Sequence, residues 1–179
     1  MKATGIIRRI DDLGRVVIPK EIRRGMRVKE GDQLEIFTFD GGVTYKKYSP
    51  VGQLSPHVDN YADALYHACG TPALICDRDR FVAVAGTYKN GLLGSGVSGQ
   101  MEQIMARREH FFCESKESIP VQLANTSEAH ASVVIPIIAA GDVVGAVCAM
   151  YSSACYPVSA TTLAVVKMIA DIIGRQAEE

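Results

Sequence analysis

The chain has 179 residues, of which 47% are hydrophobic and 22% charged, and its formal net charge is −1. This composition excludes a low-complexity chain, and the length fits one domain or two small ones. The charge is distributed unevenly along the chain. Residues 1–48 carry 11 Lys or Arg against 7 Asp or Glu, whereas residues 49–179 carry 8 Lys or Arg against 13 Asp or Glu. A basic head on an acidic body predicts two modules with different partners.

Local patterns exclude several other classes. Met1–Thr4 leads directly into a patterned strand, so no secretory leader is expected. The most apolar region, residues 133–151, is broken by Pro136 and by Gly141-Asp142, which predicts two strands and no membrane span. Five cysteines without a CxxC pair favour reduced thiols in a cytosol. The four histidines lack metal-ligand spacing, so neither a metal nor a cofactor is expected.

The first 48 residues predict a small β-rich module with one short helix. Pro19 fits the first helical position and Gly25 the stop, and Asp11–Gly14 and Asp40–Gly42 have turn chemistry. The expected strands are Thr4–Ile10, Arg15–Ile18, Leu34–Phe39 and Val43–Tyr48, and the expected helix is Lys20–Arg24. A module this small rarely folds alone without a metal or a disulfide, so we expect an obligate dimer.

Arginine is dense in this module. Seven basic residues lie between residues 5 and 28, opposed by three acidic ones. Arginine forks suit phosphate oxygens and guanine edges, and such a cluster is typical of nucleic-acid binding. The alternative is a solvated basic face, which is disfavoured because the cations repel one another without a polyanion.

The run Thr4–Arg24, with the later Glu30-Gly31-Asp32 and the Leu34–Phe39 strand, resembles the AbrB-type DNA-binding domain. The resemblance covers about the first quarter of the chain. It implies a swapped-hairpin β-barrel in which two chains interleave their strands, with double-stranded DNA as the partner. It also implies the following DNA-contacting residues: Arg8, Arg15, Arg23 and Arg24, with Arg9 and Lys20 nearby. The antitoxin branch of this fold is an alternative, but its members usually carry a short tail in place of a long apolar module.

The second module predicts an α+β arrangement around one antiparallel sheet. Its expected helices are Leu54–Cys69, Gln100–Glu109 and Ala160–Arg175. Its expected strands are Ala73–Cys76, Phe81–Gly86, His110–Cys113, Ile119–Leu123, Val133–Ala139 and Val143–Tyr151. Gly94–Gly99 formally matches GxGxxG, but it does not directly follow a strand inside a parallel βαβ unit. We therefore interpret it as a loop that caps the following helix.

Element order and apolar strands in this module resemble the GAF/PAS class of small-molecule sensor domains. The Tyr48-Ser49-Pro50 junction, the Tyr61–Tyr66 helix and the Leu74–Asp79 turn extend the resemblance over the whole chain to the stage V sporulation protein T family. That family joins an AbrB-type head, here residues 1–50, to a GAF-like regulatory and oligomerisation domain, here residues 51–179. The resemblance implies a cytoplasmic, nucleoid-associated homotetramer that activates and represses late, forespore-stage sporulation genes.

Three functions stay open for the second module. It senses a small ligand, whose identity and binding residues the sequence does not give; or it only assembles a constitutive DNA-binding protein; or it is a thiol redox enzyme, as some GAF-fold proteins are. The chain is expected not to be an enzyme, because a free cysteine on a strand usually packs as a small hydrophobe.

The last helix of this module is apolar over a wider surface than one contact with a sheet needs, and such surface usually marks an interface. The first helix offers a partner surface of similar length. We therefore expect second modules to pair through these helices and to join two head dimers into a tetramer. The residues expected at this interface are Leu54, Val58, Leu65, Val166, Ile169 and Ile173.

Overall fold

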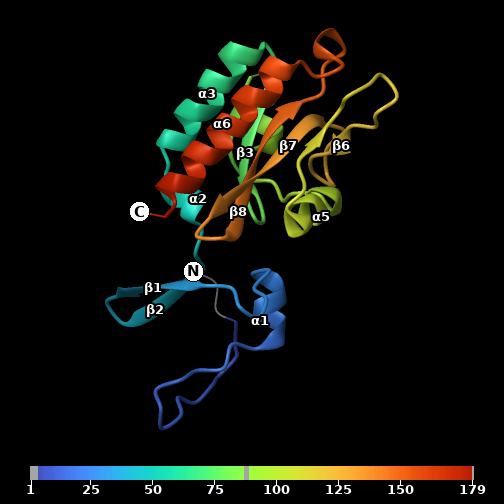
Figure 1. Ribbon diagram of the computed structural model, residues 1–179. Helices are drawn as coiled ribbons and strands as arrows, with labels where there is room; N and C mark the ends of the chain where they lie inside the picture. Colours follow the sequence, from blue (N-terminus) through green and yellow to red (C-terminus); the bar gives the residue numbers. More distant parts are fainter. Residues whose placement is uncertain (1–3, 87–88, 179) are drawn as a thin grey trace. The chain divides into compact units, whose positions relative to one another are not determined.

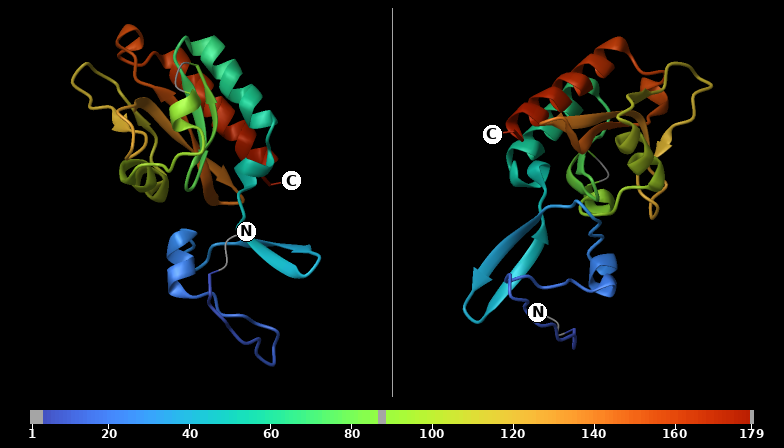
Figure 2. Two further views of the ribbon diagram at one scale, coloured as in Figure 1. Left: turned by 180° about the vertical axis from the view of Figure 1, so that it is seen from behind. Right: turned by 60° about the horizontal axis from the view of Figure 1, so that its bottom comes forward.

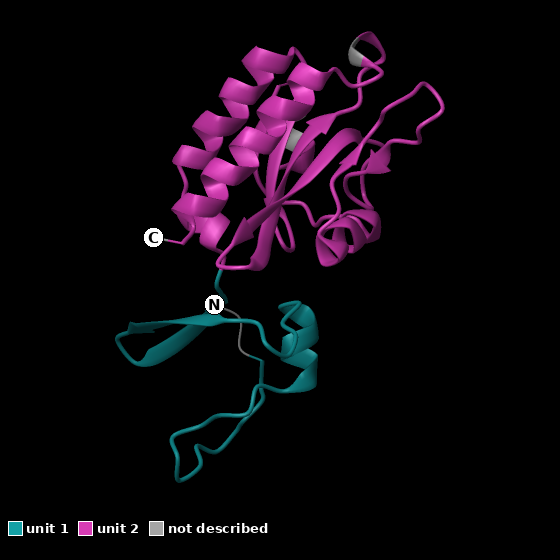
Figure 3. Ribbon diagram, viewed as in Figure 1, with its two compact units in different colours: residues 1–48 teal, residues 49–179 magenta. Residues whose placement is uncertain are grey.

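The structure is a computed structural model that describes residues 4–86 and 89–178. The chain divides into two compact units, Met1–Tyr48 and Ser49–Glu179 (Figure 3).

Unit 1 contains one short helix and one hairpin. The helix α1 spans Lys20–Gly25, and the strands β1 and β2 span Leu34–Phe39 and Gly42–Lys47. The two strands are antiparallel, with Leu34 opposite Lys47 and Phe39 opposite Gly42. The helix and this hairpin were both predicted from the sequence, and the structure confirms them.

The two expected strands before α1 are absent from the structure, which leaves residues 4–10 and 15–18 without regular secondary structure. An extended segment becomes a strand only when a neighbouring strand takes up its backbone N–H and C=O groups. The β-branched residues therefore supply strand propensity without a ladder partner within this one chain.

The ends of α1 also differ from the prediction. Pro19 is the N-cap residue, one position before the helix, and Gly25 lies inside the last turn. Gly25 is the last helical residue and Met26 the C-cap; the left-handed residue that follows is Arg27, whose φ is +53°, and the Val28 N–H donates to the Arg23 carbonyl at 2.8 Å. A left-handed residue followed by such a bond is a common helix stop.

Unit 2 is built from helices on both faces of a sheet (Figure 1). Its helices are α2 Pro50–Gln53, α3 His57–Cys69, α4 Lys89–Leu92, α5 Gly99–Arg107 and α6 Ala160–Gln176, with a 3₁₀ turn at Ser153–Cys155. Its strands are β3 Ala73–Asp77, β4 Phe81–Ala85, β5 Phe111–Phe112, β6 Val121–Gln122, β7 His130–Ala139 and β8 Asp142–Met150.

The sheet of unit 2 is antiparallel throughout its paired strands. Its order is β4-β3-β8-β7-β5, and β6 also pairs with β7. The helices α3 and α6 lie side by side on one face, and α5 covers the other (Figures 1 and 2). The expected antiparallel α+β arrangement is confirmed.

Strand alternation divides the buried side chains into two cores. In β8, Val147 and Ala149 face α3 and α6, whereas Cys148 and Met150 face α5. Successive side chains of a strand point to opposite faces, and here helices bury both faces. The strands therefore read as continuous apolar runs, which is why they were recognisable in the sequence.

Two boundaries in unit 2 differ from the sequence prediction. The expected helix over residues 54–69 begins three residues late, at His57, because a proline disfavours helical backbone at the residue before it, here Ser55. The tight turn between β7 and β8 is Ala140-Gly141, both with positive φ, one residue earlier than expected. Positive φ at both central residues matches the twist of the flanking strands.

Candidate DNA-binding surface

Three of the six predicted DNA-contacting residues lie on α1. Lys20, Arg23 and Arg24 are three and four residues apart, a spacing that places side chains on one face of a helix. All three are exposed, whereas Ile22 is partly buried. The short helix thus presents a compact group of cations to solvent.

The other three, Arg8, Arg9 and Arg15, lie on the irregular segment before α1 and are also exposed. A guanidinium nitrogen of Arg8, Nη1, donates to the carbonyl of Ile7 at 3.1 Å. The structure thus leaves all six predicted side chains accessible to a polyanion, on two separate pieces of unit 1.

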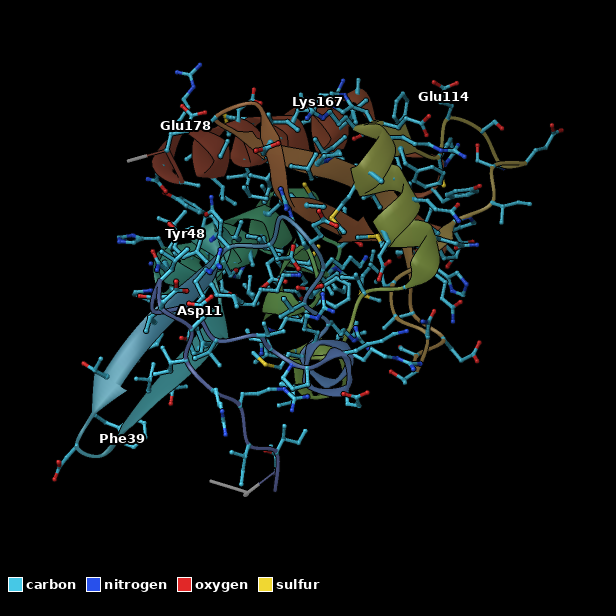
Figure 4. All side chains as sticks on the ribbon, turned by 90° about the horizontal axis from the view of Figure 1, so that it is seen from below. Asp11, Phe39, Tyr48, Glu114, Lys167 and Glu178 are labelled. Atoms are coloured by element: carbon cyan, nitrogen blue, oxygen red, sulfur yellow. The ribbon has the colours of Figure 1, made fainter. Side chains whose placement is uncertain are left out.

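Arg15 is held by an acidic residue that the sequence analysis did not single out. The Asp11 carboxylate accepts the Leu13 N–H at 3.1 Å and the Arg15 N–H at 2.7 Å on Oδ1. Its Oδ2 accepts Nε of Arg15 at 2.7 Å. The pKa of Asp11 is lowered, most by the hydrogen bond from the Arg15 backbone N–H and next by the hydrogen bond from the Arg15 guanidinium. The four-residue spacing of Asp11 and Arg15 across Gly14 was the available signal. Figure 4 labels Asp11.

Unit 1 leaves most of its apolar side chains in solvent. Of the 16 large hydrophobic residues that are exposed in the described part of the chain, 11 belong to this unit, including Ile7 at 88% and Val17 at 73%. Within described residues 4–48, Pro19 alone is buried. One copy of unit 1 therefore has no apolar core of its own.

The structure corrects the choice of residues at the expected helical interface of unit 2. Val58, Leu65, Val166, Ile169 and Ile173 are at most 6% exposed and pack in the core between the helices and the sheet. Leu54 is partly buried against the same core. A second chain cannot reach these side chains unless the unit opens.

The solvent-facing side of α6 has a different set of residues. Ala164, Met168 and Ile172 follow one another every four residues, and Met168 is 53% exposed. Beside them runs a charged row, Lys167, Asp171 and Arg175, and the two rows line one shallow open groove. Figure 4 marks Lys167 on this helix. Because the sheet-facing residues are also apolar, the sequence alone did not separate the two faces.

The first residues of unit 2 are tied to a buried carboxylate. Asp77, 5% exposed, accepts the Ser49 hydroxyl at 2.9 Å and the N–H groups of Asp79 and Arg80 at 2.7 and 2.8 Å. Asp77 thereby holds the turn between β3 and β4. This turn is hydrogen-bonded to the glycine-rich segment, because the Val97 N–H donates to the Asp79 carbonyl at 3.0 Å. A hydrogen-bonded path thus joins Ser49 to that segment.

The glycine-rich segment itself ends in a helix cap, as interpreted from the sequence. The Ser98 hydroxyl accepts the Met101 N–H at 3.2 Å at the start of α5, and Gly94 has a φ of +76°. The local geometry is therefore that of a loop leading into a capped helix.

The cysteines of the sheet are buried side chains. Cys76 and Cys148 lie on the face covered by α5. Burial raises the pKa of the Cys148 thiol, and the neighbouring Cys76 adds to the rise. Burial likewise raises the pKa of Cys113, opposed by a hydrogen bond with Tyr156. Such thiols stay protonated at neutral pH, which is unfavourable for a nucleophile.

Over residues 4–86 and 89–178, no three His, Cys, Asp or Glu side chains gather in a way that could hold a metal ion. None of the helices in that part of the chain combines the length and apolar character needed to span a bilayer.

Comparison with protein families divides the chain at nearly the same place as the structure. Residues 53–178 match the model described as "Stage V sporulation protein T C-terminal, transcription factor". Residues 7–51 match the model described as "Antidote-toxin recognition MazE, bacterial antitoxin".

Individual proteins give the same division. Stage V sporulation protein T of Bacillus subtilis (strain 168) is 49% identical over 148 residues, covering 82% of this chain and 83% of that protein. Transition state regulatory protein AbrB of the same organism is 54% identical over 50 residues, covering 28% of this chain and 52% of that protein. The GAF domain of an Acinetobacter phosphoenolpyruvate-protein phosphotransferase covers 73% of this chain and 83% of its own at 12% identity, with a TM-score of 0.52. That last likeness shows the fold alone.

An AbrB-type DNA-recognition domain followed by a GAF-like domain with an antiparallel sheet defines a two-domain transcription factor. The chain belongs to the stage V sporulation protein T family.

Proposed function

We propose that this protein is a sequence-specific regulator that binds double-stranded DNA through Arg8, Arg9, Arg15, Lys20, Arg23 and Arg24. The observation that carries the proposal is the exposed basic face of α1 within an AbrB-type domain. Phosphate contacts by these cations supply affinity and register, while arginine forks read base edges. The antitoxin alternative is less favoured, because the second unit belongs to a transcription-factor family.

Salt titration tests this surface. Each phosphate neutralised by a cation adds about 0.9 to the slope of log K against log salt concentration. The Arg23→Ala/Arg24→Ala variant should therefore lose roughly two units of slope per chain that contacts the DNA, or up to about four for a bound dimer, and bind more weakly at every salt concentration. Its matched control, Arg107→Ala/Lys116→Ala, removes two exposed cations from unit 2 and should leave the slope unchanged. Equal slopes for the two variants would contradict the assignment.

We propose that the folded head is a dimer whose two chains interleave their strands. The support is the exposure of 11 large hydrophobic side chains on unit 1, together with the two segments that lack ladder partners. A second copy would supply both the missing strands and the apolar cover. Two-fold symmetry would then double the basic surface and match a palindromic DNA site.

We propose that GAF-like units pair through the exposed side of α6 and join two dimers into a tetramer. Met168→Glu places a charge in the apolar row while leaving the buried face intact, so multi-angle light scattering should show the mass of a dimer in place of a tetramer. Thr161→Glu, at an exposed position of the first turn of α6, is the matched control and should stay tetrameric. A tetrameric, folded Met168→Glu protein would rule out this interface.

We propose that the protein activates and represses late, forespore-stage sporulation genes, and that it acts in the cytoplasm on the nucleoid. The support is similarity to a named sporulation protein over four-fifths of the chain. Genome-wide mapping of binding sites, combined with transcript levels in a deletion strain, tests it. Binding sites scattered without relation to genes that change during sporulation would contradict it.

A small-molecule effector of the GAF-like unit is part of the proposal. The support is the fold, and the hydrogen-bonded path from the glycine-rich segment through Asp77 to Ser49, where the unit begins. An effector can shift DNA binding only through its differential affinity for two arrangements of the protein. DNA affinity measured with and without a low-molecular-weight extract of sporulating cells distinguishes this from a constitutive regulator, whose affinity would not change.

A further inference from the structure

We propose that Asp11 is a positioning residue that holds the Arg15 guanidinium in a geometry ready for base readout. This inference rests on the proposed DNA-binding role of Arg15. It concerns how sequence discrimination arises, since Asp11 itself is an anion and would repel phosphate.

The loop that carries the pair is closed on itself. The Asp11 carbonyl accepts the Gly14 N–H at 3.1 Å, and the Asp11 N–H donates to the Arg15 carbonyl at 3.1 Å. Gly14 has a φ of +77°, a conformation that side chains with a Cβ rarely adopt. The backbone on either side of the tip is thereby fixed, and the two side chains start from defined positions.

The two carboxylate oxygens of Asp11 have separate tasks. Oδ1 accepts the backbone N–H groups of Leu13 and Arg15 and so maintains the turn. Oδ2 accepts Nε of Arg15 at 2.7 Å. Hydrogen bonds to the charged form of a carboxyl group lower its pKa, and the pKa of Asp11 is lowered mainly by Arg15, which agrees with this arrangement.

Because Asp11 accepts a hydrogen bond from Nε of Arg15, the far edge of the guanidinium, which carries the two Nη groups, stays available. Both Nη groups of Arg15 remain free to donate in parallel, which is the geometry that reads O6 and N7 of guanine. The side chain of Arg15 is 71% exposed and that of Asp11 37%, so their ion pair is screened by water and contributes little to folding. Its effect is on orientation, because an arginine already held in place loses less rotamer freedom when it binds.

The neighbouring Asp12 provides a matched control. It is exposed, carries the same charge and stands next to Asp11 in the same loop. Asp11→Asn retains a carbonyl oxygen for the two backbone N–H groups but replaces the acceptor facing Nε with a donor. Asp12→Asn removes the same charge without touching Arg15 through any of the bonds described above. Any change that follows from net charge alone therefore appears in both variants.

The experiment measures the affinity of the full-length protein for an operator duplex, selected from random sequence by the wild type, and for a scrambled duplex of equal length. Asp12→Asn should strengthen both affinities alike and leave their ratio unchanged. Asp11→Asn should lower the ratio by about three- to tenfold, the cost of ordering one free arginine. Arg15→Ala should lower it by roughly five- to 150-fold, and Asp11→Asn should add nothing in that background.

Three outcomes decide the matter separately. If Arg15→Ala keeps the wild-type ratio, the proposed DNA-reading role of Arg15 fails. If Arg15→Ala lowers the ratio but Asp11→Asn behaves like Asp12→Asn, the role of Arg15 stands and the positioning role of Asp11 is refuted. If Asp11→Asn lowers the ratio equally with and without Arg15, Asp11 acts through the turn and the proposal is also refuted. Circular dichroism of each variant checks that the fold is retained.

Discussion

The contact between α6 and the sheet predicts an unusual response to Gly174→Ala. Gly174 is buried on the sheet-facing side of α6. A Cβ added there would lie 2.2 Å from the carbonyl oxygen of Ile138 in β7 and 3.3 Å from its carbonyl carbon. Because the obstacle is backbone within a paired strand, it cannot rotate away as a flexible side chain could.

The magnitude follows from two opposing effects. Alanine is favoured over glycine inside a helix by about 1 kcal/mol. Relief of the overlap requires α6 to move by about 1 Å, and overpacking of this kind costs about 1–3 kcal/mol and is larger when backbone must shift. The same movement loosens the packing of Val166 and Ile173 on the sheet. We expect a net destabilisation of roughly 1–2 kcal/mol, a fall in Tm of about 3–8 °C.

Thermal unfolding followed by circular dichroism measures the effect, since the chain has no tryptophan for fluorescence. Gly99→Ala is the control, because Gly99 opens α5 and a Cβ there would have nothing within 4 Å. It should be neutral or slightly stabilising. If Gly174→Ala melts at or above the wild-type temperature while Gly99→Ala behaves as expected, the close approach of α6 to β7 is wrong.

Two other features of unit 2 give predictions of stability and reactivity. Asp77→Ala removes three hydrogen bonds from a buried carboxylate and should destabilise the unit by roughly 2–4 kcal/mol in urea unfolding, against about 1 kcal/mol for Ser49→Ala, which loses a hydroxyl cap. Equal effects of the two would contradict the central role of Asp77. Cys76 and Cys148 should resist a thiol probe at neutral pH far longer than the partly exposed Cys69, as peptide mapping by mass spectrometry would report. Because the pKa of Cys148 is raised in the folded state, its contribution to stability is complete below the pKa of the unfolded thiol and is lost as the pH rises above it. A faster reaction of Cys148 than of Cys69 would refute this burial.

The sequence predicted unit 2 well where both periodicity and burial were strong. The β7–β8 hairpin and the helices α5 and α6 appear within a few residues of their expected bounds, because their apolar patterns are long and match one period. The late start of α3, after Pro56, was missed because the apolar spacing continued through the proline. An apolar sequence pattern shows which residues avoid water, but it does not show at which residue the backbone hydrogen bonds of a helix begin.

The partner of an apolar face was harder to predict than the face itself. The C-terminal helix was expected to have two apolar surfaces, and it does, but the interface residues were chosen from the one that covers the sheet. Val166 and Met168 differ little in hydrophobicity, yet one is fully buried and the other 53% exposed. Only the position of the sheet distinguishes them. At the candidate DNA-binding surface the basic cluster was found from its density and its individual residues came from the family resemblance. Asp11 was not found, because a carboxylate among so many cations adds little to the charge pattern.

In unit 1 the basic residues and the exposed apolar residues lie on the same segment of the chain. The arginines proposed to contact DNA are interspersed along residues 6–17 with hydrophobic side chains that remain in solvent, such as Ile7 and Val17. A single copy must therefore hold the cations on a segment that has no core beneath it and little backbone pairing. Covering the apolar side chains with a second chain would order the same segment that carries Arg8 and Arg15. The loss of conformational entropy on ordering that segment would then accompany assembly of the two chains, and DNA binding would cost less. Assembly and DNA affinity are then thermodynamically linked: whatever strengthens the pairing of two chains strengthens the binding of DNA, and DNA in turn stabilises the pair.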